Sequence, residues 1–381
     1  MITTISLPAK LLFGPGALNQ LGDEAKILGK QRVMIVTYPD IRQVGLLDRV
    51  IKQLEKGGMK NPIVFEKVMP NPRVMMIDEG AALARQEKVD FMIGLGGGSA
   101  MDSAKAIGLA STGTKSIWEY VGERSPVQNM PVIMQIPTMA GTGSEMNVAA
   151  VITDWGKTHV KTAVGNIATL ARVVIVDPEL TLTVPKRQTA AGGLDILTHL
   201  AELYLTEPEP LPINDGFKET LMKTVVKYLP IVLKKPEDVE GRTELSWAST
   251  CAMSGLGLIG GTRGTMSCHG MEEAISGRFD IVHGEGLAAL FPSWMRNIEP
   301  VRKERNRMFA RNVFGRTDVD GTTACEDWLT SIGMKLRLRD LGFDLTYADE
   351  VGAVALKQAK TKNNPVPLTP KDVGDIYRLA Y

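Results

Sequence analysis

Short, mostly apolar segments alternate with helical segments over the first 185 residues, and this alternation constrains the fold more than any other feature. Runs rich in Val, Ile and Met are typical of parallel strands that are buried on both faces. Such runs lie at 32–37, 62–65, 90–95, 132–136 and 173–176. Segments with helical periodicity separate them, at 45–57, 74–87 and 100–109. The alternation predicts an open parallel sheet covered by helices on both faces.

The pattern changes near Pro185, after which strand-like runs disappear. We therefore predict two domains, an α/β domain at residues 1–185 and an all-helical domain at residues 186–381, which a chain of 381 residues can accommodate. Helices are expected in the second domain at 189–205, 214–233, 236–253, 271–276, 283–298, 302–313, 322–341 and 348–359.

Two further local patterns occur in the first domain. Residues 148–153 and 160–164 are strand-like and flank the turn-forming residues Trp155-Gly156-Lys157, which predicts a β-hairpin. Residues 9–13 form a short strand before a Gly-Pro-Gly turn. A strand at that position is often the edge of a sheet, and an edge can pair with a second subunit. We expect a homodimer or a larger homo-oligomer.

Composition and charge exclude several classes of partner. The net charge of +1 gives no electrostatic reason to expect nucleic acid or an anionic membrane as a partner. No apolar stretch reaches the length of a bilayer. The three cysteines lack the spacing of a disulfide framework, and the N-terminal sequence lacks the pattern of a signal peptide. These features predict a cytoplasmic protein.

Two glycine-containing loops follow neighbouring strands of the predicted sheet. Gly96-Gly97-Gly98-Ser99 comes directly after the strand at 90–95 and opens a helix, whose N-terminus favours an anion such as a pyrophosphate. Residues 137–145 follow the strand at 132–136 and combine glycines with hydroxyl side chains. Ligands gather at the carboxyl ends of parallel strands, so the two loops predict one nucleotide site. Glycines in an ordinary tight turn remain the alternative, because the usual dinucleotide fingerprint is absent from the first strand–helix junction.

Three of the four histidines lie in one region together with Asp195. Asp195 and His199 are four residues apart, which places both on one face of a helix. His269 and His283 are separated by Gly277, which we expect to end one helix before another begins at His283. One carboxylate and three imidazoles form a ligand set suited to a divalent transition metal. The alternative is a helix hydrogen bond between the first pair and histidines that merely pack; His159 is assigned no role.

Five motifs in the same order resemble the iron-containing (group III) alcohol dehydrogenases over nearly the whole chain. They are GGGSAMD (96–102), IPTMAGTGSE (136–145), DPEL (177–180), GLDILTH (193–199) and the segment 269–284. Within that family, HGEGLA (283–288) and PSWM (292–295) are most similar to the butanol dehydrogenase branch. The resemblance implies a dehydroquinate synthase-like fold, with a Rossmann-like dinucleotide-binding domain and an all-α metal-binding domain. It also implies hydride transfer between NAD(P)(H) and a primary alcohol or an aldehyde.

The resemblance further implies which residues form the site. The metal ion, Fe²⁺ or alternatively Zn²⁺, would be held by Asp195, His199, His269 and His283. The cofactor would be bound by Tyr38, Asp40, Gly97, Gly98, Ser99, Asp102, Thr138, Thr142, Lys161 and Leu182. No side chain in these motifs is an obvious general base. We expect the metal to act as a Lewis acid on the substrate oxygen.

Two departures from the family pattern affect these expectations. Members often have a further histidine four residues after the third metal ligand, where this chain has Glu273, an acidic neighbour of the ligands or a proton acceptor. NAD-preferring members tend to have Asp at the end of the strand 32–37, where this chain has Tyr38, with Asp40 and Arg42 nearby. Without a carboxylate beside the ribose, repulsion of a 2′-phosphate is removed, which favours NADP.

Three alternative functions would share part of this pattern. A glycerol-type polyol dehydrogenase uses a similar fold with one Asp and two His as ligands, so the third histidine argues against it. A lyase resembling dehydroquinate synthase would need a cluster of basic residues beside the metal, and only Arg263 and Arg278 lie nearby in sequence. A nucleotide-binding protein without enzymatic activity would not need the intact ligand set.

Overall fold

The computed structural model describes residues 4–123, 125–259, 261 and 264–381. The chain divides into two compact units, residues 6–184 and residues 185–381, and the described residues before Ser6 group with the second. Arg263 lies outside the described residues. None of the helices in the described part of the chain has the length and apolarity needed to cross a membrane.

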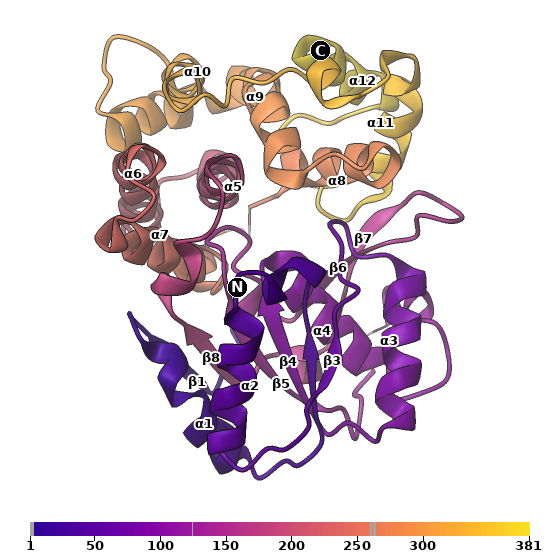
Figure 1. The fold of residues 1–381 in the computed structure, drawn as a ribbon. Helices are drawn as coiled ribbons and strands as arrows, with labels where there is room; N and C mark the ends of the chain where they lie inside the picture. The colour runs from indigo at the N-terminus through magenta and orange to yellow at the C-terminus, as the bar shows by residue number, and fades with distance from the viewer. Residues whose placement is uncertain (1–3, 124, 260, 262–263) are drawn as a thin grey trace. The chain divides into compact units, whose positions relative to one another are not determined.

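A six-stranded sheet forms the centre of the first unit, and every neighbouring pair of its strands is parallel. The order is β1-β8-β5-β4-β2-β3, so β1 lies at one edge (Figure 1). The strands are β1 (Lys10–Phe13), β2 (Val33–Val36), β3 (Ile63–Phe65), β4 (Phe91–Gly96), β5 (Val132–Pro137) and β8 (Val173–Val176). A separate antiparallel hairpin, β6 (Ala149–Thr153) with β7 (Lys161–Gly165), confirms the predicted hairpin.

The sheet is covered on both faces, as the apolar runs predict. The covering helices are α1 (Leu21–Leu28), α2 (Leu46–Lys56), α3 (Val74–Gln86) and α4 (Gly98–Ala110). Successive side chains of a strand point to opposite faces, and on β2 Met34 packs in the core under α3 and α4, whereas Ile35 packs in the core with α1 and α2. Both side chains are fully buried, which explains why the strand is apolar at every position.

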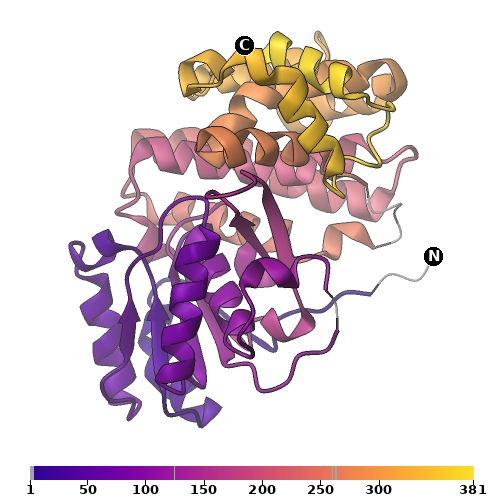
Figure 2. The same ribbon diagram turned by 90° about the vertical axis from the view of Figure 1, so that its right-hand side faces the viewer.

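The second unit consists of helices, and no strand lies in its described residues (Figures 1 and 2). Its helices are α5 (Lys186–Leu205), α6 (Pro212–Lys234), α7 (Val239–Ala252), α8 (Ser267–Phe279), α9 (His283–Phe314), α10 (Gly321–Ser331), α11 (Ala348–Lys357) and α12 (Pro370–Ala380). The expected combination of a parallel α/β unit with an all-helical unit is confirmed.

Two expectations about individual helices are wrong, and one helix was missed. Helix α8 continues through Gly277 and ends where Asp280 adopts a left-handed conformation with φ of 56°. The expected helix 322–341 ends at Ser331, because Gly333 turns the chain with φ of 72°. The final helix, α12, was not expected, although Thr369 caps it and Pro370 begins it in the manner of a regular helix start.

Candidate active site

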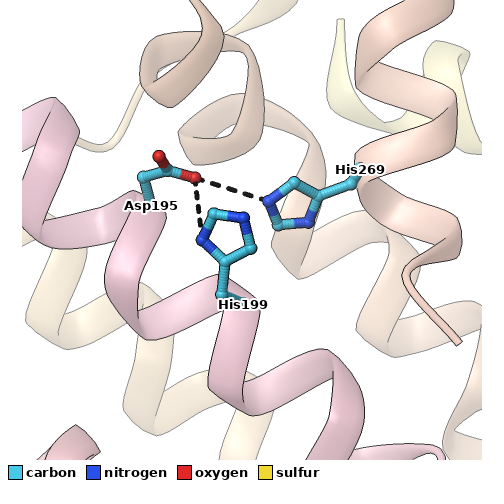
Figure 3. Close-up of side chains that lie close together, drawn as sticks. All are labelled: Asp195, His199 and His269. Carbon is cyan, nitrogen blue, oxygen red and sulfur yellow. Dashed lines mark hydrogen bonds and ion pairs between the residues drawn. The ribbon is translucent and has the colours of Figure 1, made fainter. Parts of the chain in front are cut away.

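Four side chains from three helices converge on one point in the helical unit. Asp195 and His199 lie on α5, His269 lies in the first turn of α8, and His283 is the first residue of α9. The Oδ1 atom of Asp195 lies 3.3 Å from Nδ1 of His199, 3.4 Å from Nε2 of His269 and 3.6 Å from Nε2 of His283. Figure 3 shows the first two rings facing the same carboxylate oxygen. The structure therefore brings all four predicted ligands together.

Helix packing places His283 within reach of α5. Gly284 lies so close to α5 that a Cβ atom there would be 2.4 Å from the carbonyl oxygen of Ala191. Only glycine permits this approach of the two backbones. The first turn of α9 is thereby held against the helix that carries Asp195 and His199.

A buried carboxylate orients the imidazole of His269. Glu202 is fully buried and forms a hydrogen bond with Nδ1 of His269. Its oxygens also accept hydrogen bonds from the backbone N–H of Cys268, at 2.7 Å, and of His269, at 3.2 Å. Glu202 thus satisfies two otherwise unpaired donors in the first turn of α8 and leaves Nε2 of His269 facing Asp195.

A second buried carboxylate does the same for His283. Glu272 is fully buried, and it hydrogen-bonds with Nδ1 of His283 and accepts a hydrogen bond from the hydroxyl of Ser276. A Cβ atom at Gly286 would lie 2.7 Å from a carboxylate oxygen of Glu272, so this glycine provides the space for the contact. Both histidines consequently present Nε2 to Asp195, an arrangement typical of imidazole ligands whose other nitrogen is held by a carboxylate.

The sequence interpretation missed Glu202 and Glu272, although a signal for them exists. Each follows a predicted ligand by three residues, in His199-Leu200-Ala201-Glu202 and in His269-Gly270-Met271-Glu272. Neither carboxylate binds the histidine that precedes it, because Glu202 pairs with His269 and Glu272 pairs with His283. The spacing identifies the candidates, but the pairing depends on how the helices pack.

Burial and charge shift the ionisation of the cluster. Burial alone would raise the pKa of Asp195, but the charges of the surrounding histidines, His199 first among them, lower it well below the usual range. Burial lowers the pKa of His199 to about 3. Burial also opposes the charged form of His269, yet the carboxylates of Glu202 and Asp195 raise its pKa to about 9. The carboxylate of Asp195 is therefore ionised at neutral pH, as a metal ligand must be.

The residues present fit a divalent metal ion. Ligand atoms of Asp195, His199 and His269 all lie within 4.8 Å of one another, a spread that one ion can bridge. The Nδ1 atom of His199 is buried and forms no hydrogen bond within the described chain. A buried polar atom without a partner is costly, and a cation bound among these nitrogen and oxygen atoms would supply that partner.

The predicted nucleotide loops lie side by side in the first unit. Gly97 precedes α4, and Gly96 has φ of 148°, which only glycine adopts readily. A Cβ atom at Gly98 would lie 2.5 Å from the side chain of Thr142, so the two loops are in close contact. Thr138 extends the ladder between β4 and β5, since its N–H donates to the carbonyl of Gly96 at 3.0 Å.

Tyr38 packs directly on the glycine loop. A Cβ atom at Gly96 would lie 2.6 Å from its ring, and one at Gly97 would lie 3.3 Å from its hydroxyl. Burial raises the pKa of Tyr38 to about 12, and hydrogen bonds with the backbone of Ala100 and the side chain of Ser99 partly oppose this shift. Tyr38 and Ser99 therefore adjoin the same loop, as a shared nucleotide site requires.

The carboxylate of Asp102 is occupied by contacts within the protein. It accepts hydrogen bonds from the hydroxyl of Ser144 at 2.5 Å and from the N–H of Val151 at 3.0 Å. The fully buried Lys105 lies 3.4 Å from Asp102 and donates to the carbonyl of Ser144 at 2.9 Å. Asp102 and Lys105, the second of which was not expected, thus fix the end of the loop 137–145.

The remaining predicted residues occupy different surroundings. Asp40 is exposed and accepts a hydrogen bond from Gln43 at 3.2 Å. Lys161 is buried at the start of β7, and Leu182 is half-buried beyond β8. Glu273 lies on α8 one turn beyond His269 and is 2 % exposed.

Two family descriptions match the chain in succession. Residues 8–178 match the iron-containing alcohol dehydrogenase family, and residues 189–381 match the C-terminal domain of the Fe-containing alcohol dehydrogenase family. The chain belongs to the iron-containing alcohol dehydrogenase family.

Individual relatives place the chain in one branch of that family. It is 32% identical to NADH-dependent butanol dehydrogenase A of Clostridium acetobutylicum, over 99% of this chain and 98% of the relative. It is 34% identical to the probable NADH-dependent butanol dehydrogenase 1 of Bacillus subtilis, over 92% of each chain. The crystal structure of NADH-dependent butanol dehydrogenase A from Thermotoga maritima superposes with a TM-score of 0.93 at 31% identity, covering 100% of this chain and 98% of that one.

The predicted class of activity is thereby confirmed. The protein is an oxidoreductase that transfers a hydride between a nicotinamide dinucleotide and an alcohol or aldehyde, and it is most similar to the butanol dehydrogenases. The lyase alternative would need Arg278 beside the metal, and this residue has other partners. Arg278 pairs with Glu350 at 3.0 Å and stacks 4.0 Å from the ring of Tyr347.

Glu202→Gln is expected to weaken metal binding about 10- to 100-fold, because the carboxylate that holds Nδ1 of His269 loses its charge while its size is retained. Competition for the metal with a chelator would measure the change. Glu326→Gln is a matched control, since Glu326 pairs with Arg296 at the surface. Equal metal affinity of the two variants would contradict the role given to Glu202.

Proposed function

We propose that Asp195, His199, His269 and His283 hold one divalent metal ion in this alcohol dehydrogenase, with Fe²⁺ as the native ion. The observation that supports this proposal is the convergence of three imidazole nitrogens within 3.6 Å of one oxygen of Asp195. Zn²⁺ would suit the same nitrogen and oxygen donors. When bound, the ion would supply Lewis-acid chemistry that polarises a carbonyl or stabilises an alkoxide.

The chain's own residues orient the site and exclude water from it. Glu202 and Glu272 hold two imidazoles in a fixed tautomer, and Asp195, His199 and His269 are buried. Low solvent exposure strengthens the electrostatic interactions within such a site. Within the cluster, no side chain has the position of a separate general base; a water or ribose-hydroxyl relay is our hypothesis for the proton.

For the cofactor, we propose that residues 1–185 bind the dinucleotide and residues 186–381 hold the metal. The close approach of Tyr38 to Gly96 and Gly97, and of Thr142 to Gly98, supports a shared phosphate- and ribose-binding loop. The further cofactor-binding residues in this proposal are Asp40, Gly97, Ser99, Asp102, Thr138, Lys161 and Leu182. The carboxylate of Asp102 would act through Ser144 and the loop that it fixes.

We propose NADPH as the preferred cofactor. Tyr38 is the second residue after β2, behind Thr37, so no carboxylate stands at the position that would repel a 2′-phosphate. Arg42 is 3.2 Å from Glu66 in an exposed ion pair, which is worth no more than about 1 kcal/mol and leaves the guanidinium available to a phosphate. Relatives that carry NADH in their names, and the nearby Asp40, argue for the opposite preference, and kinetic comparison of the two cofactors decides between them.

Three further proposals concern the substrate, the oligomeric state and the cellular location of the enzyme. A primary alcohol or aldehyde is the proposed substrate, because the relatives are named as butanol dehydrogenases. A homodimer or larger homo-oligomer is proposed because β1 is an edge strand. A cytoplasmic location is proposed because Cys268 and Cys325 are buried thiols that form no disulfide.

The decisive experiment combines metal analysis with an assay. The protein as isolated should contain about one divalent ion per chain, and with Fe²⁺ or Zn²⁺ it should oxidise NADPH in the presence of butanal, followed as loss of absorbance. NADH is tested in parallel, and a higher kcat/KM with NADH would overturn the cofactor preference alone. Failure to oxidise either cofactor with any aldehyde would overturn the proposed site.

A further inference from the structure

A buried ion pair lies one helical turn beyond His269. Glu273 follows His269 by four residues on α8, so both side chains lie on the same face of that helix. The ammonium group of Lys360 donates a hydrogen bond to Oε1 of Glu273. Glu273 is 2 % exposed, whereas the side chain of Lys360 retains 28% of its exposure. The pair therefore consists of a buried anion and a cation that reaches accessible space.

The turn that carries Lys360 is fixed against α8 beside the metal ligand. A Cβ atom at Gly270 would lie 2.8 Å from the side chain of Thr361 and 3.3 Å from Cβ of Lys360. The hydroxyl of Thr265 donates to the carbonyl of Lys360, and the hydroxyl of Thr361 donates to the carbonyl of Ala355 at 2.7 Å. These contacts hold Lys360 next to the residue that follows His269.

The pair has unused hydrogen-bonding capacity. The Oε2 atom of Glu273 is buried and accepts no hydrogen bond within the described chain. An ammonium group has three N–H donors, and Glu273 is the one acceptor that Lys360 has among the described residues.

We propose that Lys360, held by Glu273, binds a second oxygen of the substrate, so that the enzyme prefers diols and hydroxyaldehydes to simple alkanols and alkanals. This inference rests on the proposed function, because the second oxygen is defined relative to the carbon that reacts at the metal. The pair is neutral as a whole and offers N–H donors, which a hydroxyl group satisfies. An alkyl tail at the same place would desolvate the ammonium without compensation.

The test compares two substrates that differ by one hydroxyl group, 1,3-propanediol and 1-propanol. The metal-loaded wild-type enzyme is expected to favour the diol by at least about tenfold in kcat/KM, because one lost hydrogen bond to a charged group costs on the order of a factor of ten. In Lys360→Met this ratio should fall to about one. Metal content is measured for every variant, so that a change in the ratio is separated from loss of the ion.

Two further variants make the test decisive. Lys357→Met is the matched control, an exposed lysine at the end of α11 that should leave the ratio unchanged. Truncating Lys360 alone leaves the buried carboxylate of Glu273 unpaired, which is destabilising. The double variant Glu273→Gln/Lys360→Met avoids this unpaired charge. It should show the same loss of preference for the diol. A wild-type ratio near one, or a ratio unchanged in the double variant, would overturn the inference. Wild-type enzyme that oxidises neither alcohol would instead overturn the proposed function.

Discussion

Replacing His269 with alanine is expected to abolish metal retention and to lower kcat/KM by at least about 10³-fold, the loss that follows when Lewis-acid stabilisation worth several kcal/mol is removed. His269 faces Asp195 through Nε2 and is held by Glu202 through Nδ1. Its removal takes away one proposed ligand and leaves the buried carboxylate of Glu202 without its imidazole partner. Metal analysis of the purified variant and the aldehyde assay measure the two effects.

The control for this substitution is the one histidine outside the cluster. His159 is exposed in the turn between β6 and β7, where its ring lies 5.4 Å from that of Trp155. His159→Ala should retain the metal and the turnover of the wild-type enzyme. Because His269 belongs to the helical unit, the circular dichroism of the parallel sheet should persist in His269→Ala. Unchanged turnover in His269→Ala would show that the cluster is not the reaction centre.

Gly284→Ala is expected to destabilise the protein by about 1–3 kcal/mol, the usual cost of overpacking, and to weaken metal binding at the same time. The added Cβ atom would lie 2.4 Å from the carbonyl oxygen of Ala191. That atom belongs to the backbone of α5 and cannot rotate away, so the start of α9 must move. His283 moves with it, away from Asp195. Thermal unfolding with and without added metal measures both consequences.

A matched glycine separates this effect from the general effect of a methyl group. Gly216 lies in α6, is exposed, and has no atom within 4 Å of an added Cβ. Gly216→Ala is expected to be neutral or to stabilise the protein by up to about 1 kcal/mol, since alanine has the higher helix propensity. Equal unfolding temperatures of Gly216→Ala and Gly284→Ala would show that the close approach at Gly284 does not limit the packing of α9 on α5.

Features that depend on local pattern were predictable from the sequence. The fully apolar strands indicated a parallel sheet with two covered faces, and both cores are present. The four proposed ligands were identified because Asp195 and His199 have helical spacing and because few other histidines exist. Helix α9 begins at His283 as expected. The break expected between the helices 283–298 and 302–313 appears within α9 as a kink with non-helical angles at Arg302.

Features that depend on packing were not predictable. Glu202 is four helical turns from the start of α5 and resembles any interior residue of an amphipathic helix until α8 is placed against it. Asp102 was expected to face the cofactor, and the sequence could not show that Ser144, Val151 and Lys105 use its carboxylate. The same holds for Lys360, which is far from Glu273 in sequence and reaches it through the turn after α11.

The crossed arrangement of histidines and carboxylates makes the three helices interdependent. Helix α5 provides the carboxylate for the imidazole of α8, and α8 provides the carboxylate for the imidazole of α9. No donor can therefore be withdrawn or redirected without disturbing a neighbour that carries another donor. In the proposed metal centre, a shift in the register of any one of these three helices would therefore disturb a donor on another.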